Sequence, residues 1–156
     1  MKNIVFLSED FGKALQSLGD LDVPVTTAYK IAKNADALGQ ANKTFDELRK
    51  KLILKYCIKW EADAETKDGE PSAYKAGDPK VVENNYSFTK ENADAFGKEM
   101  NDLLNIEFTV PYKLSQKEFG EKAQLKTRYL LLLADMLSDL DLTKVAEEPK
   151  KEVANG

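Results

Sequence analysis

The sequence predicts a predominantly helical α+β fold, and three observations indicate it. Apolar residues recur every seven positions between residues 24 and 56, which is typical of a long amphipathic helix. Shorter stretches with helical apolar spacing follow a Ser or Thr that can cap them. Residues 106–114 alternate apolar and polar side chains, which is typical of a strand. The expected order is a long helix, a β-hairpin, an antiparallel helix, an edge strand and a C-terminal helix.

The composition is that of a soluble globular protein. The 156 residues are 42% hydrophobic and 32% charged, with a net charge of -4. We expect residues 1–140 to form a single helical α+β domain and residues 141–156 to form a flexible charged tail. No apolar stretch approaches the roughly 20 residues of a membrane span, so no membrane association is expected. The N-terminal segment is too polar for a signal peptide, and the single cysteine, Cys57, excludes an internal disulfide.

The N-terminal quarter contains clear start and stop signals. Residues 3–7 are β-branched or aromatic enough for a short strand. Ser8 can cap a helix that runs to about Leu18 and that Gly19 ends. Pro24 suits the first turn of a helix because its missing N–H would have no intrahelical partner there. The long helix is therefore predicted over residues 24–56.

This long helix needs a partner for its apolar stripe, which consists of Ile31, Leu38, Phe45 and Leu52. A helix over residues 90–104, capped by Thr89, has an apolar face of its own. Its members are Ala93, Phe96, Met100 and Leu103 or Leu104. Because a hairpin joins the two helices, we expect them to pack antiparallel.

The hairpin is predicted over residues 58–88. Residues 57–62 alternate, residues 63–80 are a polar loop with Gly and Pro, and residues 85–89 can return as the second strand. The aromatic residues of this region are Trp60, Tyr74 and Tyr86. Such side chains often anchor protein partners, so these three are the candidate partner-binding residues. The alternative is that they pack across the hairpin and close it.

The C-terminal third begins with the strand over residues 106–114, which Pro111 confines to an edge of the sheet. Residues 115–118 have the Ser-x-x-Glu spacing of a capping box, which predicts a short helix that Gly120 ends. Thr127 can cap a final, leucine-rich helix over residues 128–138.

No catalytic residue, metal ligand or cofactor site is predicted. The sequence contains no histidine, which excludes serine, cysteine and zinc hydrolases that depend on it. The acidic stretch 63–69 resembles a calcium loop only superficially, because its glycine stands at the seventh position. Residues 43–59 hold six basic side chains against two acidic ones, which we interpret as a solvated helix face. Nucleic-acid binding is the less favoured interpretation of that charge.

Residues 21–34, with the sequence LDVPVTTAYKIAKN, resemble the opening of a family of small uncharacterised proteins of tailed bacteriophages. The resemblance continues through residues 101–105 and the leucine-rich segment that ends at residues 133–137. It implies a phage origin and a layout of helix, hairpin, helix, strand and helix. It implies no catalytic residue.

The expected function is therefore non-enzymatic protein-protein interaction by a bacteriophage protein. We favour a virion or assembly component, whose partner is a phage structural protein or further copies of itself. The first alternative is a host-directed inhibitor or anti-defence adaptor that binds a bacterial protein. The most distant alternative is a nucleic-acid-binding accessory protein. The expected location is the host cytoplasm or the virion.

Overall fold

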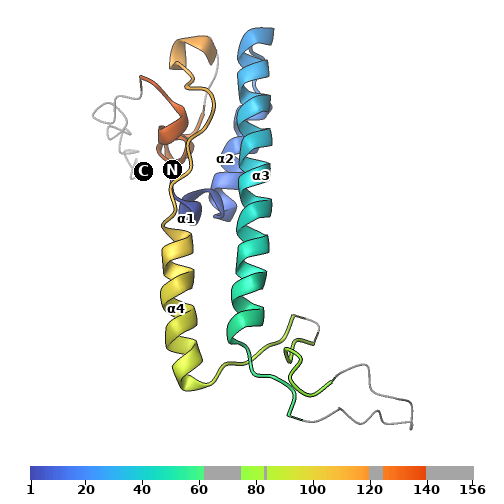
Figure 1. Ribbon diagram of the computed structural model, residues 1–156. Helices are drawn as coiled ribbons and strands as arrows, with labels where there is room; N and C mark the ends of the chain where they lie inside the picture. Colours follow the sequence, from blue (N-terminus) through green and yellow to red (C-terminus); the bar gives the residue numbers. More distant parts are fainter. Residues whose placement is uncertain (62–74, 83, 120–124, 140–156) are drawn as a thin grey trace, which may run out of the picture. The chain divides into compact units, whose positions relative to one another are not determined.

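The computed structural model describes residues 1–61, 75–82, 84–119 and 125–139. All regular elements in these ranges are helices, and only isolated β-bridges occur besides them (Figure 1). The α+β prediction is therefore wrong for the described chain. In order, the elements are α1 (Asn3–Phe6), α2 (Glu9–Gly19), α3 (Val25–Tyr56), α4 (Lys90–Leu104), the 3-10 helix η1 (Gln116–Phe119), α5 (Thr127–Leu132) and the 3-10 helix η2 (Ala134–Met136).

The chain divides into two compact units. Unit 1 contains residues 1–40 and 107–156, and unit 2 contains residues 41–106. Helix α3 contributes its N-terminal half to unit 1 and its C-terminal half to unit 2. The single domain expected for residues 1–140 stays a prediction. The expected tail, residues 141–156, lies outside the described residues.

At the N-terminus of unit 1, the strand predicted over residues 3–7 is instead the single-turn helix α1. Only Lys2 forms a bridge, antiparallel to Glu107, and the backbone N–H of Phe108 donates to the Met1 carbonyl over 2.6 Å. Phe6 is buried and meets the Phe108 ring edge-on at 6.0 Å. A short apolar run does not by itself distinguish a strand from one helical turn, and here the single turn buries the aromatic ring.

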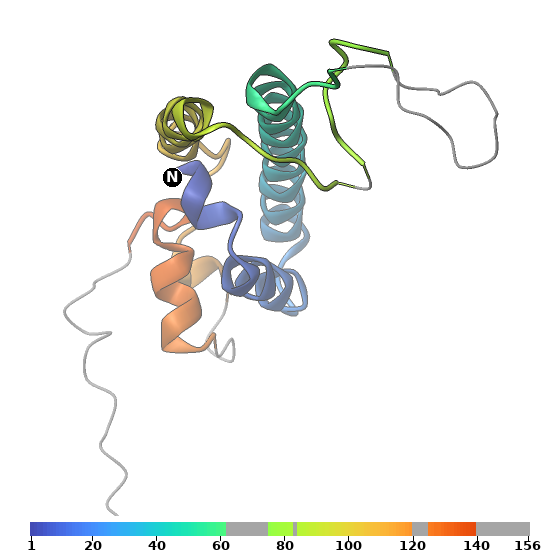
Figure 2. The ribbon, with the colours of Figure 1, turned by 90° about the horizontal axis from the view of Figure 1, so that it is seen from below.

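The second helix, α2, begins and ends where the sequence indicates. The Ser8 side chain accepts a hydrogen bond from the backbone N–H of Phe11, and the helix ends at Gly19. Its inner face is fully buried and packs against α5, which lies beside it in Figure 2. The buried side chains of α2 are Phe11, Ala14 and Leu18, and those of the α5–η2 segment are Tyr129, Leu133 and Met136.

The strand predicted over residues 106–114 does not form, and the segment bends at Pro111. The predicted alternation holds from Phe108 onward, but Ile106 is exposed rather than buried. Val110 and Leu114 are buried, whereas Thr109, Pro111 and Lys113 are exposed. The segment makes only single bridges to other backbone, at Glu107 and at Leu114, which pairs in parallel with Leu137. The predicted edge strand is wrong because no continuous partner strand lies beside it in the described chain.

A side chain takes over part of the missing strand pairing. The Asn34 amide of α3 donates to the Tyr112 carbonyl over 2.8 Å, and its Oδ1 accepts from the Tyr112 backbone N–H over 2.9 Å. Asn34 is completely buried. One amide group therefore satisfies both backbone groups of Tyr112, as a neighbouring strand would.

The predicted short helix at residues 115–118 is the 3-10 helix η1. The Glu118 carboxylate accepts from the Ser115 backbone N–H over 2.8 Å, which is one half of a capping box. The predicted stop at Gly120 lies outside the described residues.

The C-terminal helix is shorter than predicted. Helix α5 starts at Thr127 itself, and Lys126 occupies the N-cap without a side-chain hydrogen bond. After Leu132 the chain tightens into η2, and Leu137 is extended. Its neighbour Ser138 donates its backbone N–H to the Leu114 carbonyl over 2.9 Å. The helix ends early because the backbone groups of Met136 and Ser138 pair with Leu114 instead of continuing the helical hydrogen bonds.

In unit 2, helix α4 runs antiparallel to the C-terminal half of α3 (Figure 1). The Thr89 side chain caps α4 by accepting from the Asn92 backbone N–H. Tyr56 meets Phe96 edge-on at 6.4 Å, and its carbonyl accepts from the Asn92 side chain over 2.9 Å.

The apolar stripe of α3 is buried at Ile31, Leu38 and Phe45 and partly exposed at Leu52. On α4, Leu103 is buried but Ala93 is exposed, so Ala93 was wrongly assigned to the apolar face.

The predicted β-hairpin is also wrong. Residues 58–60 pair with residues 78–80 through a single bridge between Lys59 and Pro79. Toward residues 85–89 they form no bridge, although the Ile58 backbone N–H donates to the Ser87 carbonyl. The Trp60 backbone N–H donates to the Asp78 carbonyl over 2.9 Å, and that of Lys80 donates to the Ile58 carbonyl over 2.8 Å. Pro79 has no N–H to donate, which limits any extension of the ladder at that point.

Candidate partner-binding surface

The segment that follows α3 is fixed by backbone hydrogen bonds on both sides. Besides its bonds to residues 78–80, Ile58 donates its backbone N–H to the Ser87 carbonyl over 2.8 Å. Residues 58–60 therefore lie between residues 78–80 and the stretch that leads into α4. All of these residues belong to unit 2.

A tight turn follows the bridge. Val82 and Asn85 exchange both backbone hydrogen bonds, at 3.0 and 2.7 Å. Asn84, inside the turn, has a φ of 68°, in the left-handed region that Asn tolerates better than most residues. This turn directs the chain from Val82 back to Tyr86.

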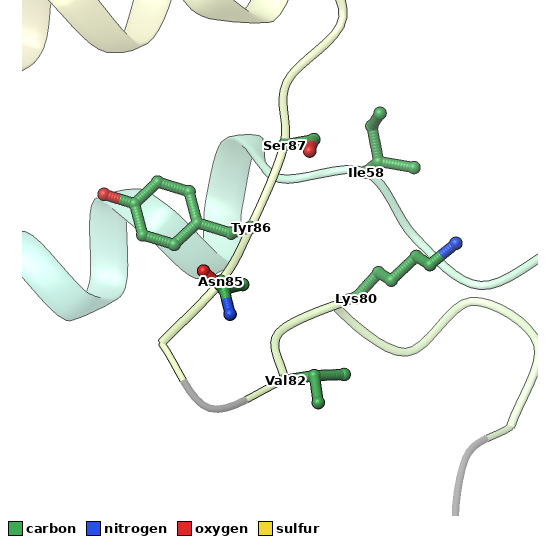
Figure 3. Close-up of a pocket in the computed structure, with 6 residues that line it drawn as sticks. All are labelled: Ile58, Lys80, Val82, Asn85, Tyr86 and Ser87. Carbon is green, nitrogen blue, oxygen red and sulfur yellow. The ribbon is translucent and has the colours of Figure 1, made fainter.

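Tyr86 borders two hollows. The first, of about 420 Å³, is lined by Tyr86 together with Ile58, Lys80, Val82, Asn85 and Ser87 (Figure 3). In that view the Tyr86 ring points to the opposite side from Ile58, Lys80 and Val82. The second, of about 370 Å³, is lined by Tyr86 together with Arg49, Lys50, Ile53, Leu54, Val81 and Asn84. We call the residues of both hollows the Tyr86 surface.

Three aliphatic side chains of the Tyr86 surface are exposed to solvent. Leu54 is 48% exposed, Val82 is 41% exposed and Ile58 is 36% exposed. A single exposed aliphatic side chain is ordinary, but several that border adjoining hollows are typical of an interaction site.

Among the described residues, the charged side chains that line the two hollows are basic. Lys80 lies over the Trp60 ring at 4.6 Å from its centroid. Arg49 and Lys50 line the second hollow from α3, and Arg49 also forms a 3.4 Å ion pair with Asp46 on its own helix. Both members of that ion pair are substantially exposed, so it holds Arg49 only weakly.

The three predicted partner-binding residues do not lie together on this surface. Tyr86 lines both hollows. Trp60 is partly buried beneath Lys80 and lines neither hollow. Tyr74 lies outside the described residues. Tyr86 also meets Phe88 edge-on at 5.3 Å, and Phe88 stacks on Phe96 of α4 at 4.5 Å, so packing accounts for part of its environment.

Sequence reasoning missed the aliphatic part of this surface. Leu54 falls outside the seven-residue stripe of α3, among lysines on the polar side. An apolar residue away from the stripe was the available signal. Val82 had no such signal, because its position depends on the turn at Asn84.

A cluster of polar side chains joins the two helices of unit 2. The Glu99 carboxylate accepts hydrogen bonds from Lys55 Nζ and Tyr56 Oη, both over 2.6 Å. These bonds lower the pKa of Glu99 below its ordinary value, Lys55 contributing most, and the same cluster raises the pKa of Lys55. The geometry holds α3 against α4. In the described ranges, no group of three His, Cys, Asp or Glu residues could hold a metal ion.

No protein-family model, no curated protein and no solved structure matches this chain. Among the described residues, no helix is both long and apolar enough to cross a membrane.

Proposed function

We propose that the protein acts by binding another protein through the Tyr86 surface. The observation that carries the proposal is the position of Tyr86 between two hollows that exposed aliphatic and basic side chains border. A tyrosine supplies a large contact area at a small cost in side-chain entropy, and the hollows can accept side chains of a partner. Hydrogen bonds to residues 58–60 and the stacking of Phe88 on Phe96 hold the segment in place beforehand.

We further propose that the protein is a virion or assembly component of a bacteriophage. The resemblance of residues 21–34 to a phage family supports the origin. A binding surface on a helical scaffold suits a protein that joins others. A host-directed inhibitor would use the same surface for a bacterial protein, so the place where the protein accumulates separates the two roles.

The binding proposal is tested with matched variants of the full chain. Purified wild type, Tyr86→Ala, Leu54→Ala and Tyr29→Ala are each immobilised and exposed to the proteins of purified phage particles and to a host extract. Tyr29 is an exposed tyrosine in unit 1, so its substitution removes the same chemical group elsewhere. We expect the two Tyr86-surface variants to weaken capture of one protein by more than about tenfold, and Tyr29→Ala to leave it unchanged.

If capture fell equally with all three variants, or fell with none of them, the use of this surface in binding would be contradicted. A deletion of residues 63–74 that keeps residues 75–88 should retain binding, since every residue that defines the Tyr86 surface is still present. Mass spectrometry of purified particles tests the phage role. A virion component is present at a fixed copy number, whereas an inhibitor is absent from the particle and co-purifies with a bacterial protein.

The basic side chains of the surface make a nucleic-acid control necessary. Electrophoretic mobility of single- and double-stranded DNA and RNA is measured with the protein at low salt, where phosphate contacts are strongest. We expect no shift, because three of the lining side chains are exposed aliphatics that suit apolar side chains better than phosphates.

A further inference from the structure

The two helices of unit 2 border a third hollow, separate from the two hollows of the Tyr86 surface. It has a volume of about 330 Å³ and lies between the C-terminal half of α3 and the end of α4. We call it the helix-pair groove. Its apolar residues are Leu48, Leu52, Leu103 and Ile106, and its charged residues are Lys51, Glu99 and Asp102.

The apolar side chains of this groove are incompletely covered. Leu48 is 37% exposed and Ile106 is 51% exposed. Leu48 lies on α3, and Ile106 follows the end of α4 at Leu104; both line the groove. An exposed leucine and an exposed isoleucine in one groove form an apolar patch that a partner can cover.

The two helices contribute charges of opposite sign to the groove. The lysine lies on α3, and both carboxylates lie on α4. Glu99 already pairs with Lys55. Lys51 and Asp102 form no ion pair with any residue in the described ranges. Each helix therefore presents one uncompensated charge beside the apolar floor, positive on α3 and negative on α4.

We propose that the helix-pair groove binds the same groove of a second copy of this chain, forming a two-fold symmetric four-helix bundle. A two-fold axis parallel to the helices places α3 of each copy over α4 of the other. Because Lys51 and Asp102 line the same groove, as do Leu48 and Ile106, Lys51 of each copy then lies opposite Asp102 of the other, and Leu48 lies opposite Ile106. An axis perpendicular to the helices would instead place like charges together. Charge therefore selects both the partner and the orientation, and the inference does not depend on the proposed function.

The oligomeric state of the full chain provides the first test. Sedimentation equilibrium over a range of concentrations should show a reversible dimer. Lys51→Glu should raise the dimer dissociation constant at least about fivefold, since symmetry introduces the repulsion twice. The double variant Lys51→Glu/Asp102→Lys restores opposite charges and should recover most of the affinity. Lys43→Glu, an exposed lysine of α3 outside the groove, is the matched control and should have no effect.

Disulfide trapping provides the second test and reports the orientation. Leu48→Cys and Ile106→Cys are made in separate full-length chains; the natural Cys57 is buried and remains. Under mild oxidation the mixture of the two chains should form a covalent dimer, whereas neither chain alone should. Circular dichroism verifies that each variant is folded. A monomer at all concentrations, an unaffected Lys51→Glu dimer, or cross-linking of one variant with itself would overturn the proposal.

Discussion

Residue scale. Asn34 is the clearest case of a side chain that replaces backbone pairing. It is buried in α3, and it exchanges two hydrogen bonds with the backbone of Tyr112. Nothing in its sequence neighbourhood separates it from Asn42, the other asparagine of the same helix. Its importance follows from the extended segment beside it.

Asn34→Ala should therefore lower the free energy of unfolding by about 2 kcal/mol, because it leaves a buried N–H and a carbonyl without partners. Denaturation by urea measures the loss. Asn42→Ala, an exposed position of the same helix, is the control and should change stability by less than about 0.5 kcal/mol. Equal effects at the two positions would contradict the role assigned to Asn34.

Glu118 gives unit 1 a dependence on pH. Its carboxylate accepts hydrogen bonds from Lys30 and from the backbone of Ser115. The hydrogen bond from Lys30 contributes most to lowering the pKa of Glu118, and the one from Ser115 follows. The pKa is lowered in the folded state, so the stabilisation is complete above the unfolded pKa of about 4.3. The stabilisation is lost as the pH falls through the lower pKa that Glu118 has in the folded state.

Glu118→Gln should accordingly be less stable than wild type at pH 7, and the gap should close as the pH falls below about 4. Thermal unfolding at a series of pH values measures it. Glu47→Gln, at an exposed glutamate of α3, serves as the control and should follow the wild-type curve. A gap that stays constant with pH would show that Glu118 acts through packing alone.

Element scale. Helix α3 is the element that both units share, and its apolar stripe is buried over most of its length. Ile31, Leu38 and Phe45 are each at most 7% exposed, and Leu52 is partly exposed. The seven-residue spacing thus identified the buried face. It did not reveal that Leu48 and Leu54 stay open to solvent, at 37% and 48%.

Phe45→Ala should cost about 3 to 5 kcal/mol, because a buried aromatic ring is removed and the space is only partly filled. Leu54→Ala on the same helix should cost less than about 1 kcal/mol, since half of that side chain is already exposed. Chemical denaturation compares the two. A loss below about 1 kcal/mol for Phe45→Ala would show that this part of the stripe is not a structural core.

Whole-molecule scale. The two units meet in the chain within α3, between Gln40 and Ala41. Gly39 lies one residue before that boundary, inside the helix, and a Cβ added there meets nothing within 4 Å. The helix is continuous through this point although glycine is a poor helix former. A side chain can therefore be introduced at residue 39 without a steric clash. Its effect on stability reports how favourable the helical conformation is at this point of α3.

Gly39→Ala should raise the free energy of unfolding by about 0.5 to 1 kcal/mol, because alanine loses less backbone entropy in a helix. Gly77→Ala is the contrasting control. A Cβ at Gly77 also meets nothing within 4 Å, but its φ of 88° is strained for any other residue. That substitution should destabilise the protein by about 1 kcal/mol. The same sign for both would show that backbone conformation is not the cause.

The sequence by itself determined α2, α3 and α4, because the signals of these helices are local. Ser8 and Thr89 cap α2 and α4 through bonds to residues three positions away, and Pro24 precedes α3 directly. The alternation predicted over residues 106–114 likewise identified Val110 and Leu114 as buried and was wrong at Ile106, which is exposed.

Only the tertiary structure decided what the extended segments became. A strand requires a partner backbone at the correct distance and register, and the sequence of one segment does not contain that partner. Residues 107–114 pair with the Asn34 side chain and with single residues, and residues 58–60 meet 78–80 in one bridge. The Tyr86 surface depends on the same non-local choices, since Val81, Asn84 and Tyr86 form one hollow together with residues 49–54 of α3. Local chemistry thus determined α2, α3 and α4, and pairing between distant segments determined the candidate site.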